Sequence, residues 1–541
     1  MPLNALSANQ EKEVSAQEIA FDKRAIAQVL EAIRPAPVAL PPEEARITVH
    51  DAVSRISVLY EKLRNAVEYR EEHLLRKGAI LRILRRQLVL ESDPIMIAHR
   101  LIRELIAARY LPNETLPESL IEDAAIVIRK YQAIEGAHAG GERHLKWVQG
   151  IIASELEEVL AEPKTEKALI TFLYQRLSGS IYVHGEPMDD LERRLQIYVS
   201  IYRSFMKADA DQAAYKYLRA FAPWWMRSEE WADEPRAFAD ELVGLQERIE
   251  GILKSRLTQK FLRAVRPWVV SLWMLKEAVE EEKEQRALLE SRTDTHTAVL
   301  NRIAKREIEA RNKVARGTVR AIIYLFITKV LFALAIEVPL EWYLYKEVSK
   351  MALAINIALP PAIMFLVGLF IRKPSSANRK RILEHIDVLL MAGSPAPQHL
   401  RPVREKGGFA NLFFSIIYLI MFIISFGLIG SILVRLHFTP VAIAVFFFFL
   451  SLVSFFGYRL RGTAKEIVVV RPKERLIGAI GDFLALPILR VGRWLSNSVS
   501  RLNIFAFTMD VIFEAPLKIF LNAMEETLVF IREKKDELSE E

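Results

Sequence analysis

The chain has 541 residues, of which 51% are apolar and 26% charged, and its formal net charge is +7. It is too apolar for a disordered protein, and without cysteine it has no disulfides, no thiolate nucleophile and no cysteine-ligated metal. A high charged fraction beside a positive mean hydropathy indicates two kinds of segment, one charged and one apolar.

The N-terminal region, residues 1–47, predicts a flexible segment that ends in a proline-rich linker. The opening MPLNALSANQEKEV has neither the basic start nor the apolar run of a secretory signal, so we expect no cleavage there. We expect residues 1–20 to be frayed. Four prolines then punctuate PAPVALPPEE, which favours an extended backbone.

The next region, residues 48–275, predicts a helical cytoplasmic domain. Apolar residues recur at spacings of three and four from Val49 to Val67, which is typical of one helix face. Prolines and glycines divide the later helices, and Pro94 is expected to stop the first long one. No strand-type alternation stands out, so the predicted fold class is all-α, with short connections that make neighbouring helices antiparallel.

Two clusters stand out within this domain. Trp224, Trp225 and Trp231 with Phe221 predict an aromatic core between helices. A basic stretch on one long helix lacks interleaved aromatic residues and any nucleic-acid module, so we expect anionic lipid and no nucleic acid as its partner. This stretch consists of Arg76, Lys77, Arg82, Arg85 and Arg86.

Residues 276–320 predict a charged helical stalk, continuous with a helix over 268–316. The segment KEAVEEEKEQRA is almost wholly charged, and residues 302–320 carry seven Lys or Arg. The favoured interpretation is a stalk whose basic end meets anionic head groups; the alternative is a solvated helix held by i,i+4 ion pairs. The candidate head-group contacts are Arg311, Lys313, Arg316 and Arg320 here, Arg379, Lys380 and Arg381 further on, and Arg459 and Arg461 after the apolar region.

Residues 321–458 predict a transmembrane region of four helices in two hairpins. A helix needs about 20 apolar residues to cross a hydrocarbon core of about 30 Å. The first candidate is the weakest because it contains a lysine. The predicted spans are 321–345, 351–371, 409–434 and 438–458, with a cytoplasmic loop at 372–408.

The distribution of Lys and Arg predicts the orientation of these spans. Seven precede the first span, two lie in 337–350, eight in 372–408, one in 435–437 and six in 459–475. The positive-inside rule then places both termini in the cytoplasm, for an integral protein of the cytoplasmic (inner) membrane. Trp342, Tyr343 and Tyr345 fall at the expected outer interface, where aromatic rings anchor.

The tail, residues 459–541, predicts membrane-associated amphipathic helices on the cytoplasmic face. Residues 476–489 form an apolar run of fourteen with Asp482 and Pro487, which suits an interfacial or re-entrant segment better than a span. We expect 476–495 and 503–530 to lie on the membrane or on the soluble domain; the alternative is two further spans. The final EKKDELSEE predicts a solvated tail.

Lys329 is the most conspicuous residue of the apolar region. It lies about 12 Å along the first span at 1.5 Å per residue. A lysine at the centre of a span costs roughly 2.5–3.5 kcal/mol, so it marks function or pairing unless its stem snorkels to the head groups. Snorkelling is the first interpretation. For a pairing role, Asn356 is the first candidate partner and Glu337 the second.

Pro360 and Pro361 are expected to kink the second span, because proline has no backbone donor. The freed carbonyls then need neighbouring helices or a polar cavity. A purely structural kink is the commoner explanation, and a transport-related break is the alternative. Gly427 and Ser431 on the third span form a small-xxx-small pair that could allow close helix approach.

The sequence carries no recognised catalytic motif. It lacks H-E-x-x-H, the phosphate loop, G-x-G-x-x-G and G-x-S-x-G, so we predict no catalytic, cofactor-binding or metal-binding residues and no cofactor. The leading hypothesis is a membrane-anchored scaffold or protein-interaction component, with protein partners or self-association. The alternative is a channel or transporter subunit that uses Lys329, Asn356 and the two prolines. An enzyme ranks third.

Overall fold

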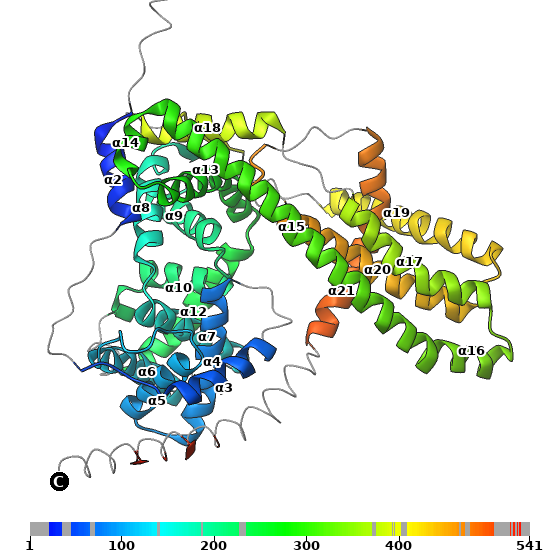
Figure 1. Cartoon of the computed structure of the whole chain (residues 1–541), viewed down its shortest axis with the longest axis horizontal. Coiled ribbons are helices and arrows are strands. Elements are labelled where there is room, and N and C mark those ends of the chain that lie inside the picture. Colours follow the sequence, from blue (N-terminus) through cyan, green and yellow to red (C-terminus); the bar gives the residue numbers. More distant parts are fainter. Residues whose placement is uncertain are drawn as a thin grey trace, which may run out of the picture. The chain divides into compact units, whose positions relative to one another are not determined.

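A computed structural model gives the architecture of the chain (Figure 1). It describes residues 21–34, 45–64, 71–137, 141–185, 188–226, 234–369, 375–391, 393, 395–401, 408–464, 467–470, 476–501 and a few positions in 520–531. Apart from one isolated bridge and two three-residue strands, the regular structure of these residues is helical, which confirms the predicted class. The strands, β1 (Ile181–Val183) and β2 (Gln398–Leu400), are too short for an alternation signal and were not predicted.

The chain divides into two compact units. Unit 1 comprises Met1–Val269, Val388–Pro402 and Ile504–Glu541, and unit 2 comprises Val270–Asp387 and Val403–Asn503. The helices of unit 1 are α2 (Lys23–Ile33), α3 (Asp51–Arg64), α4 (Glu72–Leu90), α5 (Pro94–Ala107), α6 (Ser119–Gly136), α7 (Glu142–Leu160), α8 (Lys164–Leu177), α9 (Asp190–Met206), α10 (Ala210–Phe221), the short η2 (Pro223–Met226) and α12 (Pro235–Lys254).

Unit 1 is built around a core shared by α4, α5, α6, α7 and α10, which pack against one another as sequence neighbours or near neighbours. Pro94 does end the preceding helix, and it also starts the next one. It is the first residue of α5, where its missing N–H costs nothing and Asp93 caps the Ile95 N–H. Trp225 is 1% exposed in this core, as predicted, while Trp231 lies outside the described residues.

The N-terminal segment is more ordered than predicted. Residues 23–33 form α2, whose Ala25, Ile26 and Val29 are buried and which packs against α8. Asp22 caps it by accepting from the Arg24 N–H. This helix was not predicted, because a short amphipathic helix between polar segments gives only a weak apolar periodicity. Residues 1–20 and the proline-rich linker lie outside the described residues.

Residues 388–402, predicted as part of a loop, are built into unit 1. β2 pairs in parallel with β1, with Tyr182 opposite His399. The Arg176 guanidinium on α8 donates to the carbonyl oxygens of Leu389, Met391 and Gly393 at 2.5–3.0 Å. A single arginine therefore holds the whole turn after residue 388.

Unit 2 contains the remaining helices. The predicted continuous helix over 268–316 is wrong, because the chain breaks near Glu282–Glu284 and again at Ser291. The helices are α13 (Arg256–Glu281, shared with unit 1), α14 (Gln285–Glu290), α15 (Arg292–Phe332), the π-turn η3 (Ala333–Glu337), α16 (Val338–Tyr345), α17 (Lys350–Leu369), α18 (Ser376–Leu390, also shared), α19 (Gly408–Arg435), α20 (Pro440–Ala464) and α21 (Leu476–Arg501).

The second half of the stalk and the first predicted span form one uninterrupted rod, α15 through η3 to α16 (Figure 1). Its N-terminal half is held by ion pairs between helices. Arg302 and Arg306 contact Glu277 on α13, and Arg302 and Lys305 contact Glu281. Ion pairs along the helices are present as well, Lys276–Glu280 and Arg286–Glu290 at i,i+4 and Arg306–Glu309 at i,i+3.

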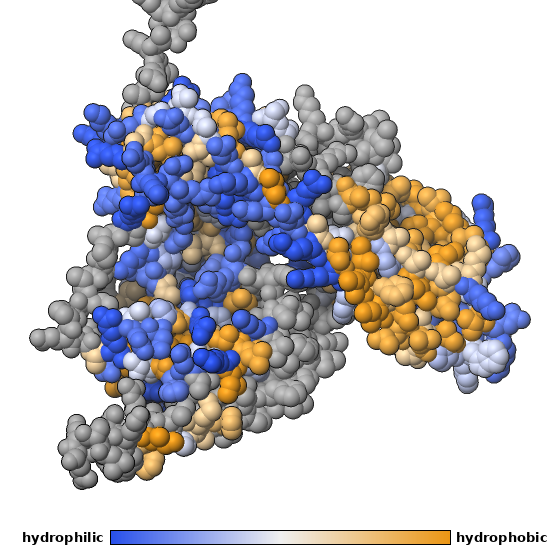
Figure 2. Space-filling model, in the orientation of Figure 1, coloured by the Kyte–Doolittle hydropathy of each residue, from blue (hydrophilic) through white to orange (hydrophobic). Residues whose placement is uncertain are grey.

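Among the described residues, three helices are long and apolar enough to cross a membrane: the rod Arg292–Tyr345, Leu412–Arg435 of α19 and Pro440–Arg459 of α20. The second predicted span, 351–371, corresponds to α17, which is apolar over the shorter stretch Lys350–Leu366. Hydrophobic residues gather on the surface of this part of unit 2 (Figure 2), among them Leu331, Leu334 and Ile423 at 60% exposed or more. An exposed apolar surface of this extent indicates membrane association.

The helix α20 is the centre of this apolar bundle, since it packs against α15, α17 and α21. The helix α21 is longer than the predicted fourteen-residue apolar run: it continues for 26 residues through Pro487 and packs on α19 and α20, while its interfacial position stays a prediction. Close approach occurs at Gly492, where an added Cβ would lie 2.0 Å from the Ser451 carbonyl oxygen. Gly427, the predicted contact, faces open space. The segment 503–530 lies mostly outside the described residues.

Candidate functional site

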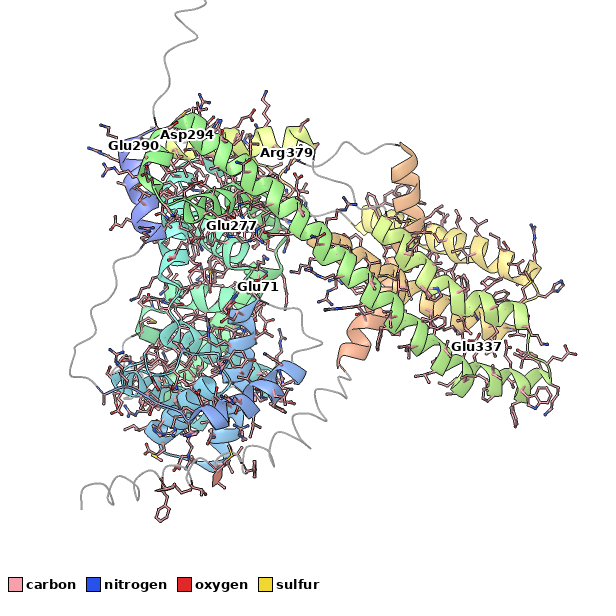
Figure 3. The ribbon with its side chains drawn as sticks, in the orientation of Figure 1. Glu71, Glu277, Glu290, Asp294, Glu337 and Arg379 are labelled. Atoms are coloured by element: carbon pink, nitrogen blue, oxygen red, sulfur yellow. The ribbon has the colours of Figure 1, made fainter. Side chains whose placement is uncertain are left out.

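One face of the α15–α16 rod is polar where it should be most apolar. Lys329, Ala333, Glu337 and Glu341 follow at intervals of four, and all are at most 2% exposed (Figure 3 labels Glu337). In an ideal α-helix eight residues would leave Glu337 about 80° from Lys329 around the axis. The extra residue of η3, where the Val338 N–H bonds to the Ala333 carbonyl, brings the two side chains back to one face.

Lys329 is fully enclosed. Its Nζ lies 2.7 Å from Glu337 Oε2, 4.5 Å from the ring centre of Phe449 and 5.6 Å from that of Phe332. With no exposed surface, the ammonium does not snorkel, and that first interpretation is wrong. Its charge is balanced by Glu337, the second of the two predicted partners, and by two aromatic faces.

Asn356 joins the same cluster from α17. Its Nδ2 donates to Glu337 Oε1 at 2.5 Å and to the Ala442 carbonyl of α20 at 3.3 Å. Both partners are acceptors, so the amide is oriented with its nitrogen toward them. Its Oδ1 points elsewhere, buried, and accepts from no donor among the described residues. The cluster thus keeps one unused acceptor.

The prolines of α17 act on this same place. The helix continues through Pro360 and Pro361, and the kink expected there stays a prediction. Because proline has no N–H, the carbonyls of Asn356 and Ile357 lose their partners four residues on. Both freed carbonyls therefore belong to the turn that carries Asn356.

Glu341, which the sequence did not single out, completes the site one turn beyond Glu337. It is 2% exposed and accepts a close hydrogen bond from Thr439, the residue that caps α20. Thr439 Oγ1 also accepts from the Ala442 N–H at 3.1 Å. The four-residue interval between 337 and 341 was the available signal, but Glu341 was placed near the span's end, where a carboxylate is ordinary.

The cluster as a whole is one hydrogen-bonded chain across four helices, α15, α16, α17 and α20, and the π-turn. It runs from Lys329 to Glu337, Asn356, Ala442, Thr439 and Glu341. Among described residues, no three His, Asp or Glu side chains gather as a metal site would require. The arrangement can hold and exchange protons or accept a small donor.

The predicted head-group contacts divide into two groups. Arg379 is engaged by Glu307 at 2.8 Å and Arg381 by Glu384 at 3.0 Å, so both serve within the protein (Figure 3). The others that the structure describes are exposed and form no ion pair among the described residues; the side chain of Arg461 lies outside them. The exposed cations are Arg311, Lys313, Arg316, Arg320, Lys380 and Arg459.

Most of the basic stretch of α4 faces other helices of unit 1, with Arg85 exposed, and its contact with lipid stays a prediction. Its cations are bonded to Glu157, Asp209 with Asp211, Glu61, Gln149 and Glu104 of unit 1. These contacts join α4 to its neighbours. A count of charged residues along the sequence does not show which of them form ion pairs with residues from distant segments.

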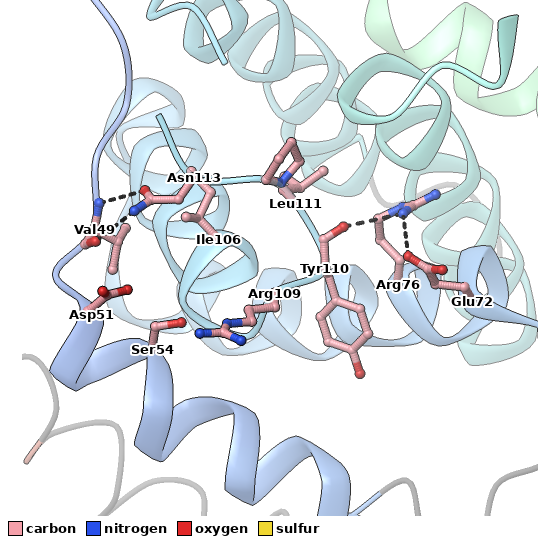
Figure 4. Close-up of a pocket in the computed structure, with 11 residues that line it drawn as sticks. Val49, Asp51, Ser54, Glu72, Arg76, Ile106, Arg109, Tyr110, Leu111 and Asn113 are labelled. Atoms are coloured by element: carbon pink, nitrogen blue, oxygen red, sulfur yellow. Dashed lines mark hydrogen bonds and ion pairs between the residues drawn. The ribbon is translucent and has the colours of Figure 1, made fainter. Parts of the chain in front are cut away.

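Unit 1 also contains a cavity of about 500 Å³ between α3, α4 and the turn after α5 (Figure 4). Asn113 bonds both the N–H and the carbonyl of Val49 on its rim, and Arg76 donates to the Tyr110 carbonyl. Arg109 sits on the rim with a φ of 59°. Its lining mixes cations and carboxylates, so the cavity has no single charge preference.

Comparison of the chain with protein-family models, with curated proteins and with solved structures found no match. Function must therefore be argued from the two units themselves.

Proposed function

We propose that the chain is an integral membrane protein that anchors a large helical protein-interaction domain to the cytoplasmic face of a membrane. Four spans, α15–α16, α17, α19 and α20, would cross the bilayer as two hairpins, with both termini cytoplasmic. Protein partners or further copies of the chain would bind unit 1.

One observation carries this proposal. The loop between the second and third spans is built into the soluble part of the protein, through β2 on β1 and the three carbonyls held by Arg176. It must therefore share a side of the membrane with unit 1. The Lys and Arg counts favour the same side independently, since this loop carries eight of them.

The anionic leaflet is the proposed lipid partner. Arg311, Lys313, Arg316 and Arg320 lie exposed on α15 immediately before its apolar part. Polybasic residues beside a span are attracted to anionic head groups by about 1 kcal/mol each.

Single cysteines test the topology, because the natural chain has none. With a membrane-impermeant maleimide on intact cells, we expect Ser349→Cys and His437→Cys to label and Ser375→Cys to label only after permeabilisation. External labelling at Ser375→Cys, or release of the chain by alkaline carbonate, would contradict the proposal.

The interaction role has its own test. Full-length protein purified from its native membrane in mild detergent should carry a stoichiometric partner or form a defined oligomer. A monodisperse monomer that carries nothing would speak against an interaction component.

A second candidate is a channel or transporter subunit. Lys329, Glu337 and Asn356, with the unused Oδ1, favour it, because ionisable groups inside a bundle commonly lie on ion or substrate paths. Solute flux into proteoliposomes should fall at least several-fold in Lys329→Leu. Equal flux in the two proteins, or none in either, would remove this candidate.

A further inference from the structure

We infer that the cavity of unit 1 binds a small zwitterion, of the class of a free amino acid or a short peptide. Arg109 takes its carboxylate, Asp51 takes its ammonium, and Ser54 forms a further hydrogen bond. The inference goes beyond the proposed function and does not depend on it, because every residue known to line the cavity belongs to unit 1. A volume of about 500 Å³ is typical of small-molecule sites.

Part of the polar lining is already engaged within the protein. The guanidinium of Arg76 is held by a carboxylate of α7 and by a backbone carbonyl of the turn after α5. Glu72 lies 3.8 Å from the same guanidinium. The amide of Asn113 uses both its oxygen and its nitrogen on the backbone of Val49. These groups build the wall of the cavity and are not available to a ligand.

Among the described residues, three polar side chains of the lining have no partner. Asp51 and Arg109 are exposed charges that form neither an ion pair nor a side-chain hydrogen bond there. Ser54 is only 7% exposed, and its hydroxyl likewise has no hydrogen-bond partner. Buried hydroxyl groups are normally hydrogen-bonded, so an unused one on the wall of a cavity indicates a ligand.

The three free groups face the same space (Figure 4). The Arg109 guanidinium points toward the Ser54 hydroxyl, and Asp51 lies one turn earlier at the start of α3. A guanidinium binds a carboxylate through two parallel N–H···O bonds, and a serine hydroxyl can donate a third. The apolar part of the lining suits an aliphatic side chain; it consists of Val49, Ile106, Leu111 and Pro112.

The free charges decide the class of ligand. An anion bound at Arg109 is repelled by the carboxylates of Asp51 and Glu72. A cation bound at Asp51 is repelled in the same way by the two guanidinium groups of the lining. A molecule that carries both charges avoids both penalties, because each of its ends meets the opposite sign.

The backbone of Arg109 supports a role for its side chain. Its φ is 59°, in the left-handed region, and it directly follows Ala108, the C-cap of α5. Glycine adopts this conformation most easily and is the usual residue at this place after a helix. Strained backbone of this kind gathers at binding sites. The turn thus carries an arginine that has no partner inside the protein where glycine would fit more easily.

Isothermal titration calorimetry of the full chain in mild detergent tests the inference, with leucine and the dipeptide leucyl-leucine as probes. We expect at least one of them to bind, and the one that binds more tightly distinguishes an amino-acid site from a peptide site. Two analogues of similar shape carry one charge each, N-acetyl-leucine and leucinamide. Each lacks one charge-assisted contact and should bind more weakly than leucine by roughly ten-fold or more.

Two glycine variants separate binding from stability. Arg109→Gly removes the guanidinium and suits the left-handed backbone, so affinity should fall by roughly ten-fold or more while the midpoint of thermal unfolding stays or rises. Glu114→Gly is the matched control. Glu114 has a φ of 62° in the same turn but is not among the residues that line the cavity, so its replacement should leave affinity unchanged.

Asp51→Asn gives a change of opposite sign for two probes. It should weaken the binding of leucine, whose ammonium loses its partner, and strengthen the binding of N-acetyl-leucine, whose carboxylate is no longer repelled.

The inference is overturned if neither zwitterion binds at millimolar concentration, if the singly charged analogues bind as tightly as leucine, or if Arg109→Gly and Glu114→Gly have equal affinity. Tighter binding of N-acetyl-leucine than of leucine by the natural chain would show an anion site and overturn it as well. The labelling and carbonate experiments do not bear on this cavity, so the binding site and the membrane anchor stand or fall separately.

Discussion

The two units bury similar polar groups in different ways. In unit 1, Lys130 donates to Glu155 at 2.7 Å and to the Trp225 carbonyl at 2.9 Å, and the Trp225 indole N–H returns to Glu155 at 2.7 Å. One ammonium faces one carboxylate, and both carboxylate oxygens are used. In unit 2, Lys329 pairs with Glu337, the buried Glu341 bonds Thr439, and the Oδ1 of Asn356 has no donor among the described residues. A closed network, in which every charge and acceptor has a partner, stabilises the core. A network with an unused acceptor can still bind a hydrogen-bond donor.

The largest expected effect tests the closed network. Replacing Lys130 by Met leaves Glu155 charged and buried, which costs about 3–5 kcal/mol of unfolding free energy. Thermal unfolding of the full chain, followed by tryptophan fluorescence, should show unit 1 melting far earlier. Adding Glu155→Gln should recover much of the loss. If Lys130→Met alone were as stable as the natural chain, the ion pair between Lys130 and Glu155 would not contribute to the stability of unit 1.

A smaller effect is expected at the α20–α21 contact. A methyl group at Gly492 collides with the Ser451 backbone, so Gly492→Ala should cost about 1–3 kcal/mol, the usual range for overpacking. Gly481→Ala on the same helix meets open space and serves as the control. Thermal stability in detergent distinguishes them, and equal stability would mean that α21 does not pack on α20.

The ion pairs of the stalk give a pH-dependent effect. Burial raises the pKa of Glu277, but hydrogen bonds from Arg306 and Arg302 outweigh burial and hold it below its usual value. A carboxyl group whose pKa is lower in the folded state stabilises the folded state at pH values above its ordinary pKa, and this contribution is lost as the pH falls. Glu277→Gln should therefore cost about 1 kcal/mol at neutral pH and progressively less as the pH falls below the ordinary carboxyl pKa. Exposed Glu282→Gln should show no such trend.

The smallest effect concerns lipid. Arg316→Gln should reduce the thermal stabilisation that anionic phospholipid gives in detergent by an amount near 1 kcal/mol. Arg109→Gln, an exposed cation of unit 1, is the comparison variant. If both variants respond alike, the cations of α15 have no special contact with head groups.

Hydropathy was enough to locate the apolar helices: 351–371 and 409–434 match α17 and α19 closely, 438–458 lies mostly within the longer α20, and 321–345 is the last part of the rod that begins at Arg292. It was also enough to mark Lys329 and Asn356, because a polar residue in such a run has few harmless positions. Glu337 was predicted only as the second candidate partner, because its place on the same face as Lys329 depends on η3, which no local pattern encodes. The close contact at Gly492 and the ion pairs of the α4 cations could not be predicted either, because their partners lie far away in the sequence.

The long helix α15 has a mechanical consequence. Its 41 residues make a shaft about 60 Å long, with Lys329 near one end and, at the other, Arg292 and His296 gripping Asp387 of α18. An α-helix resists stretching, so a small screw or piston displacement at the lysine end is delivered almost undiminished to the grip on α18. The pairing of Lys329 and the hold on Asp387 of α18 are thereby linked by a single helical backbone.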